Sequence, residues 1–298
     1  MDQNGRVFRD GDHTIVEVPW ANGHHALDQP GVEVTNPDAP EADRIIRKVF
    51  TRKRTLYLPD ELDRAREAHV AHPDNLVLSM NGYSQITAEQ CQRYGIQPGG
   101  YEAACAALLR RTITHLRQRF PAAQLRIISG ASALGVDLAI NAVAREFNIT
   151  PLGFSCPEFM LWVDDDELPV YVAASKDEYA DRYIQTLDLL IATGGREHAL
   201  QHDVLSACIY GKRIHFVDVL SMLSSTGTVP ATIVDVRGRV RVENAAAAMG
   251  RYVSFFSVRK APAQTPAGGD VWDALFDDVA SVATEVCRGK LSPDRKFG

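Results

Sequence analysis

The segment LRIISGASALGVDLAINAVARE, residues 125–146, decides how the rest of the chain can be interpreted. It opens with a short β-branched apolar run, Leu125–Ile128, which suits a strand that is buried on both faces. Small residues follow over Ser129–Ser132. From Leu134 onward the apolar side chains return at the three- and four-residue spacing of a helix. The segment therefore predicts a strand, a tight loop and a helix.

A loop of this kind can bind an anion, because the first backbone N–H groups of a helix have no partner within the helix. Asp137 lies in the first turn of the predicted helix, where the helix dipole favours a carboxylate. Two specific phosphate motifs are absent. Val136 and Asp137 stand where a P-loop has Lys and Ser or Thr. Ala131 and Ser132 interrupt the dinucleotide pattern G-x-G-x-x-G. Taken alone, the loop fits an ordinary strand-to-helix turn equally well.

Composition and charge narrow the class of protein. The chain has 298 residues, of which 45% are apolar and 23% charged, as in soluble globular proteins. No stretch approaches the ~20 consecutive apolar residues of a membrane span. The first residues lack the apolar core of a signal peptide, and the five cysteines show no C-x-x-C pairing, so we expect a cytoplasmic protein. The net charge of −6 argues against a protein whose main function is to bind nucleic acid.

Apolar runs alternate with helical patterns over much of the chain. The predicted strands are Asn75–Met80, Leu125–Ile128, Thr150–Phe154, Leu189–Ala192 and Arg213–Val217, with further helices over Tyr101–Arg119, Asp177–Leu187 and Glu197–Tyr210. This alternation predicts an α/β fold with a doubly wound, mainly parallel sheet of Rossmann-like type. We expect this nucleotide-binding domain to occupy residues 73–222. An N-terminal extension would occupy residues 1–72, and a C-terminal addition of hairpin, linker and helix residues 223–298.

In such a sheet, right-handed crossovers bring the loops after the strands to one edge, where ligands bind. We call this predicted edge the rim. It gathers loops of small and polar residues at Gly82–Tyr83, Ser129–Ser132, Ser155–Cys156 and Thr193–Arg196. The gathering of several such loops, rather than any single motif, predicts a ligand site.

Two segments resemble one superfamily of nucleotide-binding proteins. SGASALGVDLAINAVA, residues 129–144, is similar to its Gly-rich loop, and LDLLIATGGREHALQHDVLSACIYGKRIHFVD, residues 187–218, is similar to its later strand–GG–helix–strand signature. The superfamily joins the LONELY GUY phosphoribohydrolases, the DNA-processing protein of natural transformation and the SLOG sensor domains. The resemblance covers residues 75–218 and implies a Rossmann-like fold that holds a nucleotide phosphate.

The rim and the resemblance together predict a set of ligand- and phosphate-binding residues. These are Gly82, Tyr83, Ser129, Gly130, Ala131, Ser132, Asp137, Thr193, Gly194, Gly195 and Arg196. Among them, Arg196 would add a fixed positive charge suited to bidentate contact with phosphate.

The chain departs from the superfamily at the catalytic signature. The phosphoribohydrolases carry P-G-G-x-G-T-x-x-E, whereas Thr193 replaces the Pro here and Gln201 occupies the position of the Glu. Gln cannot take or give the proton that acid–base catalysis requires. The retained glycine loops therefore favour a sensor or carrier of a nucleotide. The alternative is an N-glycosidic hydrolase of nucleoside monophosphates, in which Glu197 or Asp203 would supply a displaced catalytic carboxylate.

The remaining expectations concern metals, basic residues and partners. His198 and His202 lie at i, i+4 of a predicted helix, but Ala199 stands where the metalloprotease pattern has Glu, so we expect no metal and no cofactor. The upstream Arg motif of the superfamily is absent, and Lys176 and Arg182 are the nearest basic candidates. We expect a small nucleotide ligand and a homo-oligomer, a dimer. DNA binding, as in the transformation protein, is the poorest hypothesis, because the chain has no basic, aromatic-laced stripe. A membrane partner is not expected.

Overall fold

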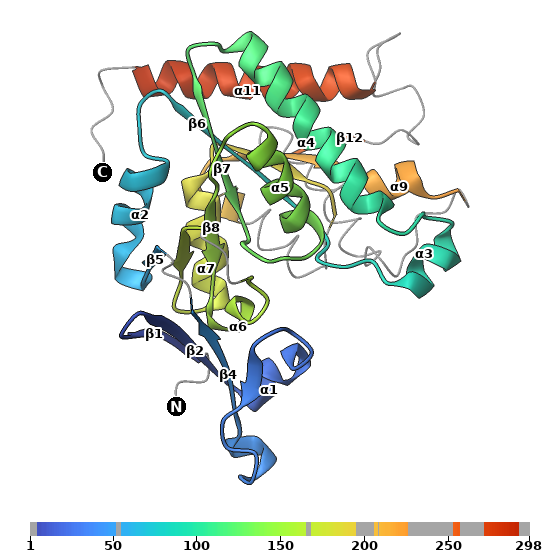
Figure 1. The fold of residues 1–298 in the computed structure, drawn as a ribbon. Coiled ribbons are helices and arrows are strands. Elements are labelled where there is room, and N and C mark those ends of the chain that lie inside the picture. Colours follow the sequence, from blue (N-terminus) through green and yellow to red (C-terminus); the bar gives the residue numbers. More distant parts are fainter. Residues whose placement is uncertain are drawn as a thin grey trace.

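The computed structural model describes residues 5–51, 55–164, 168–194, 206–207, 209–225, 253–256 and 271–291 (Figure 1). A parallel sheet forms its centre. In spatial order its strands are β12 (Val253–Phe256), β11 (Arg213–Val217), β10 (Leu189–Ala192), β6 (Asn75–Asn81), β7 (Gln124–Ser129), β8 (Leu152–Ser155), β9 (Val170–Val172) and β5 (Leu56–Tyr57). Every neighbouring pair runs parallel. The predicted α/β, doubly wound, Rossmann-like fold is confirmed.

The five strands predicted from apolar runs are β6, β7, β8, β10 and β11. All residues of β8 and β10 are buried, as expected for strands covered by helices on both faces. Strands β5, β9 and β12 extend the two edges of the same sheet. The boundaries at residues 73 and 222 stay a prediction. β5 and β12 lie outside them in the sequence and still pair with this sheet.

Helices cover both faces of the sheet. They are α2 (Leu62–His69), α3 (Ala88–Tyr94), α4 (Gly100–Arg119), α5 (Gly135–Glu146), α6 (Pro157–Met160), α7 (Lys176–Thr186), α9 (Val219–Leu223) and α11 (Val271–Leu291). α4 packs against α5, α9 and α11 (Figure 1). Because crossovers between parallel strands are right-handed, α7, which leads the chain back from β9 to β10, lies on the opposite face from α4 and α5. The strand order thus reverses between β6 and β10.

The N-terminal residues form a second sheet, which is antiparallel. Its order is β1 (Arg6–Asp10), β2 (His13–Pro19), β4 (Ile45–Phe50) and β3 (Val32–Val34), and a short helix α1 (Trp20–Gly23) follows β2. The apolar side of this sheet, including Val16 and Ile46, shares one buried cluster with Ala131 of the rim and Met160 of α6. The second sheet therefore packs beside the loops after β7 and β8, as Figure 1 shows near α6.

Two buried charged groups of the second sheet, Glu17 and Lys48, have hydrogen-bond partners. The buried carboxylate of Glu17 accepts hydrogen bonds from Arg6 and Arg47, with shortest distances of 2.6 Å to each guanidinium. Burial alone would raise the pKa of Glu17, but the hydrogen bonds from Arg47 and Arg6 outweigh it and lower that pKa. The buried ammonium of Lys48 donates to the carbonyl oxygens of Leu161 and Val163, both at 2.9 Å. These contacts tie the second sheet to the turn after α6.

Some predicted elements lie outside the described residues, including the C-terminal hairpin, the linker and most of the helix over 197–210. Of the helices in the described ranges, none has the length and apolar composition needed to cross a bilayer.

Candidate functional site

The rim forms where the parallel strands β10, β6, β7 and β8 end side by side. Asn81 closes β6 and pairs with Ala192 at the end of β10, so the loops beginning at Gly82 and Thr193 start next to each other. β7 lies on the other side of β6 and leads into the loop that holds Gly130. The structure therefore brings three of the four predicted loops together. They are represented by Gly82–Tyr83, Ser129–Ser132 and Thr193–Gly194.

Hydrogen bonds through two buried hydroxyls join β6 to β10. The amide of Tyr83 donates to the phenol oxygen of Tyr101 at 2.9 Å, and that phenol lies 2.7 Å from the hydroxyl of Thr193. The Thr193 hydroxyl donates to the carbonyl of Asn81 at 2.9 Å, so Tyr101 must be the donor to Thr193. The Thr193 amide also donates to Asn81, at 2.8 Å. Burial raises the pKa of Tyr101 well above its ordinary value, which keeps this phenol a protonated donor.

This geometry gives Thr193 two roles inside the protein. A proline there would have neither the N–H nor the hydroxyl that bond Asn81. Gly82 and Gly194 are required by the same packing. A Cβ on Gly82 would overlap the Tyr101 and Thr193 oxygens, and one on Gly194, whose φ is +134°, would overlap the ring of Tyr83. Both glycines are therefore accounted for within the protein, without a ligand.

The β7 loop is organised around Asp137. Its half-buried carboxylate accepts hydrogen bonds from the Gly130 amide at 2.8 Å and from the Ser132 hydroxyl at 2.7 Å. Burial raises the pKa of Asp137, although the hydrogen bonds from Ser132 and Gly130 act in the opposite direction. A Cβ on Gly130 would lie 2.5 Å from the Asp137 carboxylate. The glycine is thus needed to admit the carboxylate.

Three other residues fix the position of this loop. Ser129 is fully buried, donates to the Asn141 side chain at 3.1 Å and accepts from the Ala131 amide at 3.3 Å. Ala131 has a positive φ of 60° and lies in the apolar cluster of the second sheet. Gly135 begins α5 with φ +48°, and a Cβ there would overlap the backbone oxygens of Tyr83 and Ser84. Predicted ligand residues Ser129 and Ala131 therefore face inward, while Ser132 and Asp137 remain partly exposed.

Sequence reasoning missed a buried acid at the β8 end of the rim. Glu158 follows Cys156 and Pro157, and its Oε1 lies 3.8 Å from the ammonium of Lys176. Its Oε2 is buried without a hydrogen-bond partner among the described residues. Burial, and then the nearby Glu158, raise the pKa of the Cys156 thiol, which disfavours a nucleophilic thiolate. The only sequence signal for Glu158 was its place directly after a predicted strand and a proline.

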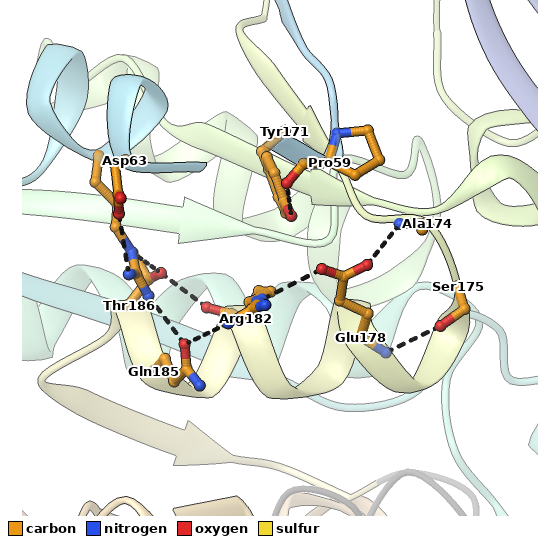
Figure 2. A network of polar contacts seen from close by, with 10 residues as sticks. Pro59, Asp63, Tyr171, Ala174, Ser175, Glu178, Arg182, Gln185 and Thr186 are labelled. Carbon is orange, nitrogen blue, oxygen red and sulfur yellow. Dashed lines mark hydrogen bonds and ion pairs between the residues drawn. The ribbon is translucent and has the colours of Figure 1, made fainter. Parts of the chain in front are cut away.

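The structure separates the two basic candidates, Lys176 and Arg182. Lys176 begins α7, just beyond the end of β9, and lies at the rim beside Glu158. Arg182 is two turns further along α7 and bonds Glu178 and Gln185, each at 3.3 Å (Figure 2). The same network joins α7 to α2, where Arg66 donates to Thr186 at 2.9 Å. Arg182 is therefore engaged with side chains of its own helix, away from the rim.

Several predicted site residues lie outside the described residues. These are Gly195, Arg196, the tentative catalytic pair Glu197 and Asp203, Gln201, and the histidines His198 and His202. Within the described ranges, no group of three or more His, Cys, Asp or Glu side chains is arranged to hold a metal ion.

The fold is that of a Rossmann-like α/β protein, a class that binds ligands at this edge of the sheet. No protein-family model matches the chain, and no curated protein matches it. Two structures of the molybdenum cofactor carrier protein from Chlamydomonas reinhardtii align with TM-scores of 0.42 and 0.40, at 15% and 16% identity, over 72% and 73% of this chain and 99% of each carrier chain. A structure of the protein TM1055 aligns with a TM-score of 0.32 at 17% identity, over 57% of this chain and 98% of that chain. At these TM-scores the alignments assign no ligand and no residue role to this chain.

Proposed function

We propose that this protein binds a nucleotide or a nucleotide-derived molecule at the rim and senses or carries it without turning it over. The observation that carries the proposal is the reversal of strand order between β6 and β10, which puts Gly82–Tyr83 beside Thr193–Gly194. Doubly wound sheets hold their ligands at this switch point. The class of ligand comes from the sequence, because the loops after β7 and β10 resemble those of a nucleotide-binding superfamily.

The rigidity of the β6–β10 junction supports a binding role. Tyr101 and Thr193 are buried and fully engaged in the hydroxyl chain, so the backbone at Tyr83 and Thr193 is held in place before a ligand arrives. A site that is ordered in advance loses less conformational entropy on binding. In this proposal the phosphate is held on the β10 side, where the sequence also places Gly195 and Arg196.

Glu158 favours N-glycosidic hydrolysis as a second candidate function. Cleavage of a glycosidic bond needs a carboxyl group at the sugar. Glu158 is a buried acid at the rim, and Lys176 lies beside it. Under this candidate, released base should appear when nucleoside monophosphates are incubated with the protein. Glu158→Gln, Glu197→Gln and Asp203→Asn, tested one at a time, would identify which acid the cleavage needs.

The proposal is tested by thermal shift with AMP, ADP, cyclic AMP, ADP-ribose and the corresponding guanine compounds, followed by chromatography for free base. A ligand at 100 times its Kd should stabilise the protein by about 2.7 kcal/mol. Stabilisation without free base is the expected result. Free base would establish the hydrolase instead, and no stabilisation by any nucleotide would refute both.

A matched pair of glycine variants locates the site. Gly194→Ala should displace the Tyr83 ring and abolish the ligand-induced shift. Gly211 also has a positive φ, of 61°, but faces open space, so Gly211→Ala should keep that shift. Equal shifts in both variants would place the ligand elsewhere. The expected homodimer is part of the proposal and is tested by light scattering with and without ligand.

A further inference from the structure

The β7 loop contains the features of an anion site, yet the described structure already places an anion in it. The Asp137 carboxylate lies 2.8 Å from the Gly130 amide nitrogen and 2.7 Å from the Ser132 hydroxyl oxygen. These are the donors that a phosphate on this loop would need. A phosphate there would have to displace Asp137 or lie against its negative charge.

Most of the backbone donors over residues 130–138 are also engaged inside the protein. The residues whose N–H bonds an oxygen of the chain are Gly130, Ala131, Ala133, Val136, Asp137 and Leu138. Their acceptors include the carbonyls of Trp162 and Tyr83, which belong to neighbouring loops. A helix N-terminus binds phosphate through free amides. In the first turn of α5, the amides of Val136, Asp137 and Leu138 are directed at oxygens of the protein itself.

We propose that Asp137 fills the anion position of the β7 loop and makes this half of the rim select the uncharged, hydroxyl-bearing part of the ligand. The proposal rests on the proposed function and specifies it further. Asp137 is half-buried, and a carboxylate has room for about four hydrogen bonds, so it retains acceptor capacity toward the rim. A ribose hydroxyl is the donor that a nucleotide offers to such an acceptor. The ligand phosphate is left to the other loops.

The test measures the affinities of three probes, inorganic phosphate, adenosine and 2′,3′-dideoxyadenosine, for the wild type and for Asp137→Asn. The variant keeps the shape of the side chain and removes its charge. Phosphate affinity should rise about tenfold, because a nearby negative charge is removed. Adenosine affinity should fall about tenfold, and the wild type should prefer adenosine to its dideoxy analogue by a similar factor. Weaker phosphate binding in Asp137→Asn, or unchanged adenosine binding, would overturn the proposal.

Asp188 provides the control. It is also half-buried, and it accepts the Val77 amide at 2.9 Å, but it precedes β10 and so lies at the opposite edge of the sheet. Asp188→Asn removes the same charge and should change none of the three affinities. A change as large as that of Asp137→Asn would reveal a general effect of charge and count against the proposal.

Ser132→Ala keeps the proposal testable if Asp137→Asn does not fold. Because the Ser132 hydroxyl donates to Asp137, its loss should leave phosphate affinity within about twofold. A loss near tenfold would show that Ser132 binds phosphate and would overturn the proposal. If the wild type binds no nucleoside or nucleotide, the proposed function fails. The phosphate measurements still decide whether Asp137 excludes anions from this loop.

Discussion

The two halves of the rim, the β6–β10 junction and the β7 loop, have similar Gly-containing sequences but are held by different interactions. At the β6–β10 junction, neutral groups form a directed chain from the buried Tyr101 through the buried Thr193 to the carbonyl of Asn81. In the β7 loop, one half-buried charge, Asp137, collects the donors. Both halves need glycine to make room for a side chain, but the side chains differ in kind. Gly194 makes room for an aromatic ring, and Gly130 makes room for a carboxylate.

The comparison shows that a Gly-rich loop after a strand is not in itself evidence of a ligand. Each described rim glycine would clash with a part of the protein if it carried a Cβ. What distinguishes the halves is which groups remain for a ligand. The junction supplies a rigid frame, and the β7 loop supplies a carboxylate acceptor. The two halves meet at Gly135, where the Val136 amide donates to the Tyr83 carbonyl at 3.1 Å.

The largest effect is expected where the halves meet. Gly135→Ala adds a Cβ that would overlap the Tyr83 and Ser84 carbonyls, which are backbone atoms and cannot rotate away. We expect a loss of about 3 kcal/mol or more in the free energy of unfolding, measured by urea denaturation. Gly11 has a similar φ, of +59°, and nothing within 4 Å of its Cβ position. Gly11→Ala should cost only about 1 kcal/mol. Equal losses would mean that backbone strain, and not the contact between the halves, sets the cost.

The next largest effect is expected from a substitution that disrupts only the β6–β10 junction. Tyr101→Phe removes a buried hydroxyl and leaves the Tyr83 amide without its acceptor. We expect a loss of about 2 kcal/mol, together with faster hydrogen exchange at the Tyr83 amide. The control is Tyr57→Phe, because the Tyr57 hydroxyl meets His69 at 3.0 Å in a part-buried position where water can replace it. That variant should lose less than about 1 kcal/mol. Unchanged exchange at Tyr83 in Tyr101→Phe would contradict the hydrogen bond from the Tyr83 amide to the Tyr101 hydroxyl.

The five central strands of the large sheet could be predicted because both faces of a parallel sheet are buried, so its strands have continuous runs of apolar residues. β4 could not be found this way. Its sequence IIRKVF alternates in burial, but the inward-facing Lys48 carries a charge that hides the pattern, and only tertiary contacts to Leu161 and Val163 make its burial acceptable. β5 and β9 are two and three residues long, too short to show any period.

The rim could be predicted as a place, but the roles of its residues could not. Topology brings strand ends together whatever their side chains, so the loops at Gly82, Gly130 and Thr193 were found from sequence order alone. The partners of each residue depend on contacts between distant segments. Tyr101 lies 92 positions from Thr193, and no local pattern connects them. The capture of Gly130 by Asp137 is local, but the spacing also fits a free anion loop.

The smallest expected effect concerns Asp137 in the β7 loop, and it is a change of protein stability with pH whose direction can be predicted. Asp137 has an ordinary pKa of 3.8, which burial raises in the folded protein. Between these two values the folded state binds more protons than the unfolded state, so stability falls as the pH rises. The stability of the wild type relative to Asp137→Asn should therefore be highest below pH 3.8 and decline as the pH passes the raised pKa, by less than the Tyr101→Phe loss. Urea denaturation at a series of pH values measures this difference.

Glu17 gives the opposite sign and serves as the internal control. The pKa of this carboxyl is lowered from 4.5, because Arg47 and Arg6 outweigh the effect of burial. Its contribution is therefore present above pH 4.5 and lost as the pH falls through the lowered value. The difference between wild type and Glu17→Gln should rise with pH, whereas the difference for Asp137→Asn falls. Two slopes of the same sign would mean that Asp137 is held by its donors as firmly as a paired carboxylate. The β7 loop would then stabilise the charged form, as an anion site does.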